Sequence, residues 1–545
     1  MVRNVGWYLL INTLGLSLIM KTTFKLPLII LGAFLFCLPL KAQDIHKYRI
    51  YFTDKGSEIA FDPFTYFDAK AIERRIRMGL PLAEFSDYPV NETYLMDLSQ
   101  MGIQIKQCSR WLNAATVWAS DVQIERVKQL HFVAEIELCT FSVCTPASID
   151  EELFDDDDEA LLLERQTTRL GAKRLAADNL NGNGIRVAIF DVGYAGADNH
   201  DAFEHLRIKN RIIKTWDFVD NDGQVYHGGT HGTSVWSCVG GKVDSSWSGL
   251  AWDAEFLLAR TEMARSEPFS EEENWVAAAE WADQNGADII NSSLGYTDTR
   301  YFPEQMNGKK TFITRGANIA ARKGMLVVNA AGNEGSGKWR IIGAPADADS
   351  VLAVGGLEPC CDYRIDFSSY GPTADKRLKP NVSAQGRVYC ATDVGNETAD
   401  GTSFASPLVA GLAACLWQKE RSLTNMQLFR KIEASGHLYP YYDYAHGYGM
   451  PTYEKFIESP KVSEYITVEQ DAAQNEIRIV CNDTTTAAEE QKLLYYAIVN
   501  PAGLLMSYYV ISVSERIPLI LYPSNYPPAS RLRLSFKGQY LEIPL

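Results

Sequence analysis

Apolar runs alternate with helical patterns through the middle of the chain, from Asn183 to about Pro460. Continuous apolar runs are typical of parallel strands that are buried on both faces. Between them lie helical stretches such as Trp275–Gln284, which Gly286 ends. This order predicts an α/β fold of three layers (α/β/α) with a mainly parallel sheet, whose ligands collect at the carboxyl ends of the strands. The predicted strands are Val187–Phe190, Glu255–Ala259, Asp288–Asn291, Met325–Asn329 and Val351–Val354.

The patterns on either side of this region are different. Residues from about Tyr48 to Cys139 alternate strand-like and helix-like stretches, including a basic helix over Phe67–Met78, and predict a small α+β domain. An acidic stretch, Asp150–Glu159, follows it and is typical of an exposed linker. After Pro460 the helical patterns disappear, and short strands between turn residues predict a β-sandwich.

The N-terminal segment is typical of an export signal. Lys21 and Lys25 precede the apolar run Leu26–Leu40, and Ala42 offers a cleavage point. Met20 makes a better start than Met1, because it opens the charged region directly. We therefore expect an exported protein.

Composition excludes few classes of function. A chain of 545 residues with 46% hydrophobic and 22% charged residues is a globular protein of several domains. The net charge of -16 argues against nucleic acid as a partner. Ten cysteines in a chain of this length are too few for a dense disulfide framework. One or two disulfides are nevertheless compatible with an exported protein. The favoured pairing joins Cys360 or Cys361 to Cys390, and adjacent Cys360 and Cys361 lack the partners of a zinc site.

Residues of the three types that form a catalytic triad stand at the ends of the predicted elements. Asp191 follows a strand, His231 begins a helical stretch, and Ser403 lies on a glycine turn that opens an apolar helix. A serine hydroxyl needs a neutral imidazole to take its proton, and the imidazole needs a carboxylate to fix its tautomer. Aspartate, histidine, serine is one of the known chain orders of this triad.

Asn333 adds a fourth element, on a glycine turn past a strand end. Its amide can donate to a developing oxyanion beside the backbone N–H of Ser403. Each residue alone has a structural explanation: Asp191 as a helix cap, His231 as a buried hydrogen-bonded side chain, Asn333 as a turn residue. Together, in this order and at these positions, they favour catalysis.

Four motifs resemble the signatures of the subtilases, the subtilisin-like serine endopeptidases of the S8 family. The resemblance covers about Gln166 to Pro460 and implies Asp191, His231 and Ser403 as the triad, with Asn333 as the oxyanion donor. The motifs are Phe190–Gly193, His231–Thr233, Ala331–Asn333 and Gly401–Pro407.

The same resemblance implies a substrate-binding strand whose backbone pairs with an extended peptide. Two residues depart from the family pattern: Ser234 and Trp236 replace a histidine and a small residue after His231. We expect Trp236 to require repacking near the site, on the S2 side of the cleft. The implied substrate-binding residues are Ser293, Leu294, Gly295, Ala331 and Gly332.

Residues 44 to about 140 resemble the subtilase propeptide, an inhibitory chaperone that is cut away after folding. Within them, Ser109–Ala115 is similar to subtilases of Bacteroidetes-type bacteria. The expected domains are a signal peptide at 1–42, a propeptide-like domain with its linker at 43–160, a peptidase domain at 161–460 and a β-sandwich, a candidate secretion or sorting domain, at 461–545.

The sequence therefore predicts a secreted or cell-surface serine endopeptidase, made as a zymogen, that works through an acyl-enzyme intermediate. Its expected partners are an extended protein or peptide substrate and its own propeptide as an intramolecular inhibitor, with no nucleic acid and no stable membrane anchor. No cofactor is needed for the chemistry, and structural calcium stays open with no ligands assigned. The alternative is a catalytically inert protease-fold protein that binds or adheres at the cell surface.

Overall fold

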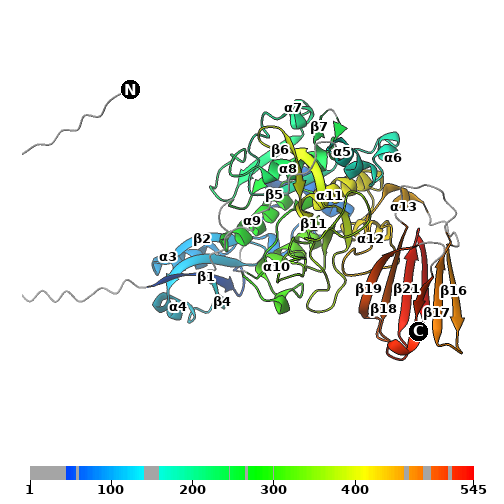
Figure 1. Ribbon diagram of the computed structural model, residues 1–545. Coiled ribbons are helices and arrows are strands. Elements are labelled where there is room, and N and C mark those ends of the chain that lie inside the picture. The colour runs from blue at the N-terminus through cyan, green and yellow to red at the C-terminus, as the bar shows by residue number, and fades with distance from the viewer. Residues whose placement is uncertain are drawn as a thin grey trace, which may run out of the picture. The chain divides into compact units, whose positions relative to one another are not determined.

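A computed structural model describes residues 44–56, 61–139, 159–244, 246–263, 268–298, 300–458, 465–482, 492–513 and 518–545. The expected signal peptide (1–42) and the acidic stretch up to Asp158 lie outside these residues. Ile45–Leu545 form one unit (Figure 1). Among the helices in the described part of the chain, none combines the length and apolar composition of a membrane span.

The centre of the fold is a parallel sheet of seven strands, in the order β13-β12-β11-β10-β5-β9-β6. The five predicted strands are its middle, and the two edges, β6 and β13, are additional. Their bounds are β5 (Arg186–Asp191), β6 (Ile212–Asp217), β9 (Glu255–Arg260), β10 (Ile289–Ser292), β11 (Leu326–Ala330), β12 (Val351–Leu357) and β13 (Val382–Gln385).

Helices cover both faces of this sheet, so the predicted three-layer α/β/α fold is confirmed (Figure 1). Along β5, Val187 and Ile189 point into one core with α8 and α11, while Ala188 and Phe190 point into another with α9 and α10. The helices are α5 (Glu159–Thr168), α6 (Ala172–Ala177), α7 (Glu204–Ile208), α8 (His231–Gly240), α9 (Ser270–Gln284), α10 (Phe312–Arg322), α11 (Thr402–Lys419), α12 (Asn425–Ala434) and α13 (Tyr453–Ile457).

The N-terminal domain is an antiparallel sheet in the order β2-β3-β1-β4 with helices on one face. Ile50 and Val117 point toward those helices, whereas Tyr51 and Ala114 point toward α9 and α10 of the central domain. The elements are β1 (Ile45–Phe52), α1 (Pro63–Tyr66), α2 (Ala69–Arg77), η1 (Phe85–Asp87), α3 (Glu92–Gln100), β2 (Gln104–Ser109), β3 (Ala114–Ser120), α4 (Asp121–Val127) and β4 (Val133–Cys139).

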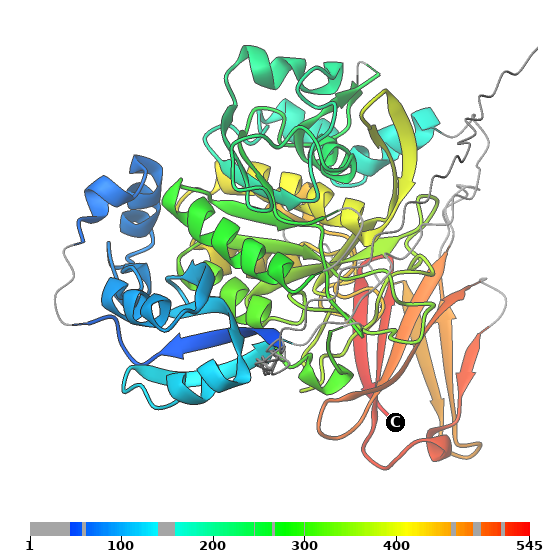
Figure 2. The same ribbon diagram turned by 90° about the vertical axis from the view of Figure 1, so that its left-hand side faces the viewer.

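The C-terminal domain consists of two antiparallel sheets, β16-β17-β20 and β19-β18-β21-β22, packed around a shared core (Figure 2). Ile477 and Ile479 from the first sheet meet Leu494 and Leu532 from the second. The strands are β16 (Ile466–Asp471), β17 (Glu476–Cys481), β18 (Leu493–Val499), β19 (Leu505–Ser512), β20 (Leu519–Leu521), β21 (Arg531–Phe536) and β22 (Gln539–Pro544).

The favoured disulfide is not formed. Cys390 is buried in the hairpin β14 (Arg387–Ala391) and β15 (Asn396–Asp400), with its Sγ 3.7 Å from the carbonyl oxygen of Glu397. Cys360 is exposed, and its Sγ lies 3.0 Å from that of Cys361. All three thiols are free, so the pairing expected from the sequence is wrong.

Candidate active site

The candidate catalytic residues lie at the carboxyl ends of neighbouring strands. Asp191 is the last residue of β5, Ser293 follows β10, and Asn333 lies three residues beyond β11. These strands are adjacent in the order β11-β10-β5. The carboxyl ends of parallel strands meet at one edge, and this is where α/β folds bind ligands.

Asp191 and His231 are hydrogen-bonded to each other. His231 begins α8, and its Nδ1 lies 2.8 Å from Asp191 Oδ1. The same oxygen accepts the backbone N–H of Val192 at 2.8 Å, which fixes the carboxylate plane. Asp191 is completely buried, while the imidazole of His231 is partly exposed. A carboxylate that accepts from Nδ1–H leaves Nε2 as the unprotonated nitrogen of the neutral ring.

The environment changes the basicity of His231. Burial alone would lower the pKa of its imidazole, but the negative charge of Asp191 and the hydrogen bond to it outweigh burial and leave the pKa raised. A base with a raised pKa takes a proton from a hydroxyl more readily. It also becomes protonated, and therefore inactive as a base, at a higher pH.

Ser403 is the second residue of α11, after Gly401, which has a φ of 156° in the region that favours glycine. Its Oγ donates to the carbonyl oxygen of Ser293 at 3.2 Å rather than to His231. The ring of the next residue, Phe404, lies 5.6 Å from that of His231, measured between ring centroids. The start of α11, which carries Ser403, is therefore near the ring of His231, and catalytic hydrogen bonds are often loose without substrate.

Asn333 is exposed and tied to the same turn. Its Oδ1 accepts the backbone N–H of Thr402 at 2.9 Å and the hydroxyl of Thr402 at 2.8 Å. Because the oxygen of the amide is engaged in this way, its Nδ2 is the group left to donate elsewhere. The backbone N–H of Ser403 lies in the first turn of α11, at the positive end of the helix dipole.

Thr402 is a positioning residue that the sequence analysis did not single out. Besides donating to Asn333, its Oγ1 accepts the N–H of Gly332 at 3.1 Å. One hydroxyl therefore joins the turn that carries Asn333 to the turn that carries Ser403. The signal was available, since Thr402 directly precedes the candidate nucleophile.

The five implied substrate-binding residues have different surroundings. Gly295 is exposed, whereas Ser293 and Leu294 are buried beside it, and the carbonyl of Leu294 accepts Asn329 Nδ2 at 2.9 Å. The next residue, Tyr296, pairs with Ala344 through two backbone hydrogen bonds, which anchor this segment. The N–H of Ala331 and that of Gly332 are both already used within the protein, by Val354 O and Thr402 Oγ1.

Trp236 lies away from the cleft, contrary to the expectation for the S2 side. Its indole is fully buried in the core under α8, stacked on Phe203 with ring centroids 4.0 Å apart, and packed against Tyr194. Ser234 donates to the carbonyl oxygen of Ala391 at 2.8 Å and joins α8 to β14. Ser234 and Trp236, the two departures from the family pattern, therefore both make their contacts on the interior side of α8.

One group of side chains in the described part of the chain comes close enough to share a cation: Asp217, Asp220 and His227. Arg260 already donates to both carboxylates, to Asp217 at 2.7 Å and to Asp220 at 2.5 Å. A guanidinium in this position supplies the positive charge that a metal ion would bring. This cluster is therefore an ion-pair network beside the site.

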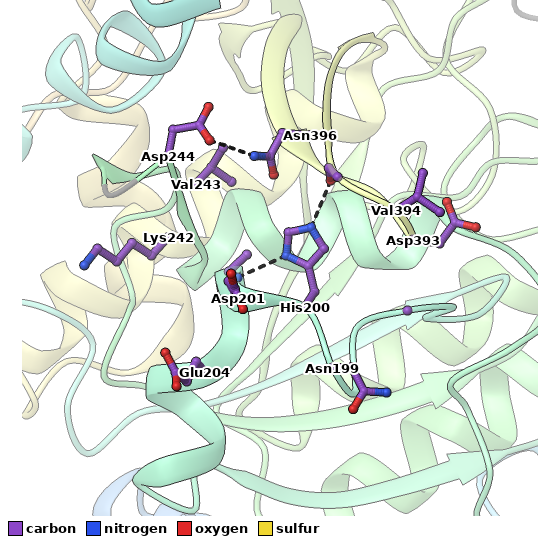
Figure 3. A pocket seen from close by; sticks show the side chains of 13 residues that line it. Asn199, His200, Asp201, Glu204, Lys242, Val243, Asp244, Asp393, Val394 and Asn396 are labelled. Carbon is purple, nitrogen blue, oxygen red and sulfur yellow. Dashed lines mark hydrogen bonds between the residues drawn. The ribbon is translucent and has the colours of Figure 1, made fainter.

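A surface hollow of about 840 Å³ is lined by residues other than those of the candidate triad (Figure 3). His200 stands in its wall, with Nδ1 accepting the N–H of Ala202 at 3.0 Å and Nε2 at 2.9 Å from the carbonyl oxygen of Gly395. On the other side, Asn396 donates to Asp244 at 2.9 Å. His200 thus joins the loop after β5 to the β14–β15 hairpin, and Asp244 joins the segment after α8 to the same hairpin.

Comparisons with known proteins agree with this geometry. Residues 182–449 match the Subtilase family, and residues 47–151 match the Peptidase S8 propeptide domain of Bacteroidota. The chain is 31% identical over 266 residues to subtilisin DY of Bacillus licheniformis, which covers 48% of this chain and 88% of that relative. It is 29% identical over 317 residues to alkaline elastase YaB of Bacillus sp. (strain YaB), covering 57% and 76%.

Among solved structures, the epidermin leader peptide processing serine protease of Staphylococcus aureus is similar in fold. The TM-score is 0.53 at 15% identity, over 77% of this chain and 100% of that chain. At this identity the likeness concerns the fold alone.

Proposed function

The chain belongs to the subtilase family of serine-type endopeptidases and carries a propeptide domain, and on that premise we propose that it hydrolyses peptide bonds with Asp191, His231 and Ser403 as its triad. The observation that carries this proposal is the 2.8 Å hydrogen bond between Asp191 and His231, next to the helix start that presents Ser403. A buried carboxylate that fixes one imidazole tautomer beside a serine is an arrangement for acyl transfer.

In the proposed reaction Ser403 Oγ exchanges its bond to Ser293 O for one to His231 Nε2. It then attacks the carbonyl carbon of the scissile peptide while its proton moves to Nε2. Asp191 stabilises the imidazolium that forms. The proton passes on to the leaving amine, which departs and leaves an acyl-enzyme on Ser403. A water molecule, deprotonated by His231 in turn, hydrolyses that ester and restores the serine.

Two donors are proposed for the oxyanion of the tetrahedral intermediate: Asn333 Nδ2 and the backbone N–H of Ser403. The fixed orientation of the Asn333 amide, held by two hydrogen bonds from Thr402, supports this assignment. A donor that is oriented before the reaction stabilises the transition state without reorganisation. Removing one such donor typically lowers kcat by about 10²–10³-fold.

We assign the extended substrate to the segment Ser293–Gly295. Gly295 is exposed there, and the backbone of the segment is held from behind by Asn329 and Ala344. An exposed extended backbone on a fixed support is suited to pairing with a peptide strand. The N–H groups of Ala331 and Gly332 are used internally, and Ala331 is buried, so of the two only the partly exposed Gly332 would present surface to the substrate.

The export-type N-terminus and the propeptide domain support a protein that is secreted as a zymogen and processed within the acidic stretch before Glu159. For the chemistry itself we propose no cofactor, because serine, imidazole, carboxylate and amide supply every proton transfer and charge named above. We propose neither a nucleic-acid partner nor a stable membrane anchor for this protein.

The test is Ser403→Ala in the full chain. We expect casein hydrolysis, self-processing and labelling by a fluorophosphonate probe all to be lost, because only an activated serine reacts with that probe. Ser422→Ala, at an exposed position beyond the end of α11, is the matched control and should keep all three. A parent chain that the probe does not label would favour the inert binding protein instead.

A further inference from the structure

The propeptide domain has a helical segment between β1 and α3. Residues 61–88, named the arm below, contain α1, α2 and η1. The arm has a small apolar cluster of its own, formed by Phe67, Ala71 and Ile72 with Phe61 and Leu82 around them. It is therefore a folded element rather than an extended loop. Figure 2 shows its dark-blue helices beside the central domain.

The arm contacts the amino-terminal edge of the parallel sheet, where four adjacent strands begin. Arg186 starts β5, Glu255 starts β9, Asp288 directly precedes β10 and Lys323 lies three residues before β11. Each of these residues binds a residue of α2 or its N-cap. The contacts are Arg186 with Asp68 at 3.2 Å, Lys70 with Glu255 at 2.9 Å, Arg77 with Asp288 at 3.2 Å, and Arg74 with the carbonyl oxygen of Lys323 at 3.2 Å.

Two glycines of the catalytic domain make room for the arm. Gly286 ends α9 and Gly324 ends α10, both with positive φ. A Cβ on Gly286 would lie 2.8 Å from Lys70 Cβ, and one on Gly324 would lie 2.5 Å from Met78 Sδ. The arm thus lies directly on the two turns that lead into β10 and β11.

The centre of the contact is a buried cluster of charges. Arg74 and Arg75 donate to the carboxylate of Asp283, the second at 2.7 Å, and Lys323 donates to Asp87 of the arm at 2.5 Å. All five side chains are at most 3% exposed. Arg74 also donates to the carbonyl oxygens at the ends of both helices, those of Ala287 and Lys323. Buried charges that pair across two domains fix one relative arrangement.

We infer that the arm is the anchor of the propeptide: it holds the propeptide domain on the amino-terminal edge of the catalytic sheet, independently of what occupies the substrate cleft. The inference rests on the proposed function, in which the protein is made as a zymogen and this domain is its propeptide. The catalytic residues lie at the opposite edge of the same strands. Arg186 and Asp191 are the first and last of the six residues of β5, so five rises of about 3.3 Å place them about 16–17 Å apart along the strand.

In this arrangement, the contacts that hold the propeptide on the catalytic domain lie apart from the substrate cleft. A cut between the two domains removes their covalent link, but it leaves every contact of the arm in place. The propeptide then stays bound until the contacts of the arm, and those of the propeptide sheet with α9 and α10, are lost. Loss of these contacts, rather than the cut itself, releases the propeptide.

The test uses the full chain with Ser403→Ala, so that no self-digestion occurs, and a recognition sequence for an unrelated site-specific protease in place of Asp155–Asp158. After cutting, the catalytic part is held on a resin by a C-terminal tag, and release of the propeptide is followed over time. We expect Arg74→Ala/Arg75→Ala to speed release at least about tenfold, because one partner of a buried ion pair is left alone.

Arg126→Ala/Lys128→Ala is the matched control. It removes two positive charges from exposed positions at the end of α4 in the same domain, and it should leave the rate unchanged. Equal release from the arm variant and the parent would overturn the inference. The assay needs no peptidase activity, so its outcome is independent of whether Ser403 is the nucleophile.

A second measurement needs no substitution in the arm and therefore tests the inference even if the arm variant fails to fold. In the Ser403→Ala chain itself, amide hydrogen exchange of the turns around Gly286 and Gly324 is compared in three states: intact, cut, and cut with the propeptide stripped off. We expect slow exchange in the first two states and faster exchange in the third. Exchange that rises on cutting alone would overturn the inference, as would exchange that is the same in all three states.

Discussion

Two domains flank the catalytic domain, and they contact it through different kinds of side chain. The propeptide domain combines an apolar strip around Trp111 with buried ion pairs, such as those of Asp283 with Arg74 and Arg75 and of Glu273 with Lys47. Glu280 adds a half-buried carboxylate that accepts three hydrogen bonds from Ser109–Trp111. Charged side chains are thus concentrated where the propeptide domain meets the catalytic domain.

The C-terminal β-sandwich meets the catalytic domain through aromatic and aliphatic side chains. Tyr495 of β18 lies 6.1 Å from Tyr441 and 5.4 Å from His446, measured between ring centroids, and its hydroxyl donates to the carbonyl oxygen of Asp362 at 2.9 Å. Leu438 and Leu493 complete this cluster. Successive residues of β18 face alternately this cluster and the core of the sandwich.

The two interfaces differ in how easily they can separate. Charged side chains regain water when two surfaces part, so the contact of the propeptide, which is partly ionic, can separate while leaving only the apolar strip around Trp111 exposed. A tyrosine-rich surface has no such compensation, and permanent interfaces are accordingly the more apolar ones. We therefore expect the β-sandwich to be an integral part of the mature enzyme and the propeptide to be a removable one.

The largest expected effect is at the aromatic contact. Tyr495→Ala removes a ring that is 4% exposed and should lower the free energy of unfolding by about 3–5 kcal/mol, the usual cost of deleting a buried aromatic side chain. The measurement is guanidinium unfolding of the Ser403→Ala chain. The loss should be the same with the propeptide attached and after its removal.

Tyr509→Ala is the control for this loss. Tyr509 lies on the neighbouring strand β19, is 46% exposed and stacks on Tyr496, so its removal should cost about 1 kcal/mol or less. Equal losses for the two tyrosines would mean that the catalytic domain adds nothing to the burial of Tyr495. The contrast between the two flanking domains would then be lost.

At the ionic contact the effect should depend on the propeptide. Asp283→Ala leaves Arg74 and Arg75 buried without their carboxylate and should destabilise the full chain by about 3 kcal/mol. Once the propeptide has been cut off and stripped, Asp283 faces water and the same substitution should have little effect. Unfolding curves of both forms give the two values, with Asp366→Ala, at a fully exposed aspartate, as the control that changes neither.

A loss of the same size in both forms would contradict this prediction. It would show that Asp283 stabilises the catalytic domain itself and is no part of a separable contact.

Much of the fold could be predicted because the middle strands are apolar on both faces. β5 and β11 are buried along their whole length. The edge strand β6 could not be recognised in the same way, since Lys214 and Thr215 interrupt its apolar run, and β13 has only four residues. Edge strands have one neighbour and more exposure, which weakens the pattern.

For the site, the motif residues could be predicted but not their contacts. The sequence does not say that Ser403 Oγ rests on Ser293 O, since that depends on how two distant turns meet. The position of Trp236 was open to better reasoning: five residues after His231 it lies roughly 140° around α8, facing the core. Arg74 and Arg75 were predicted only as a basic helix, because charged residues are rarely buried.

The contrast also predicts a dependence on pH. Burial alone would raise the pKa of the Glu84 and Glu255 carboxyls, but Lys323 holds the first low, and Lys70 with Arg186 holds the second low. A carboxylate whose pKa is lowered in the docked state favours docking above its free pKa, about 4.3 for glutamate, and this contribution is lost as the pH falls below it. Release of the cut propeptide should therefore be severalfold faster at pH 4 than at pH 7.

Glu84→Gln/Glu255→Gln tests the cause, since an amide does not titrate in this range. The variant should release the propeptide faster than the parent at pH 7, with a smaller further increase at pH 4. A pH dependence as steep as that of the parent would assign the effect to other carboxylates of the contact.

The smallest effect is expected where the arm is most exposed. Lys70 pairs with Glu255 at 2.9 Å, but both side chains are partly exposed, and Arg186 donates to the same carboxylate at 2.9 Å. Exposed pairs contribute only about 0–1 kcal/mol, so Lys70→Ala should speed release of the propeptide by less than about fivefold. If Lys70→Ala released it as fast as Arg74→Ala/Arg75→Ala, the arm would be held by overall charge. A clear difference between them would show that burial makes these ion pairs an anchor.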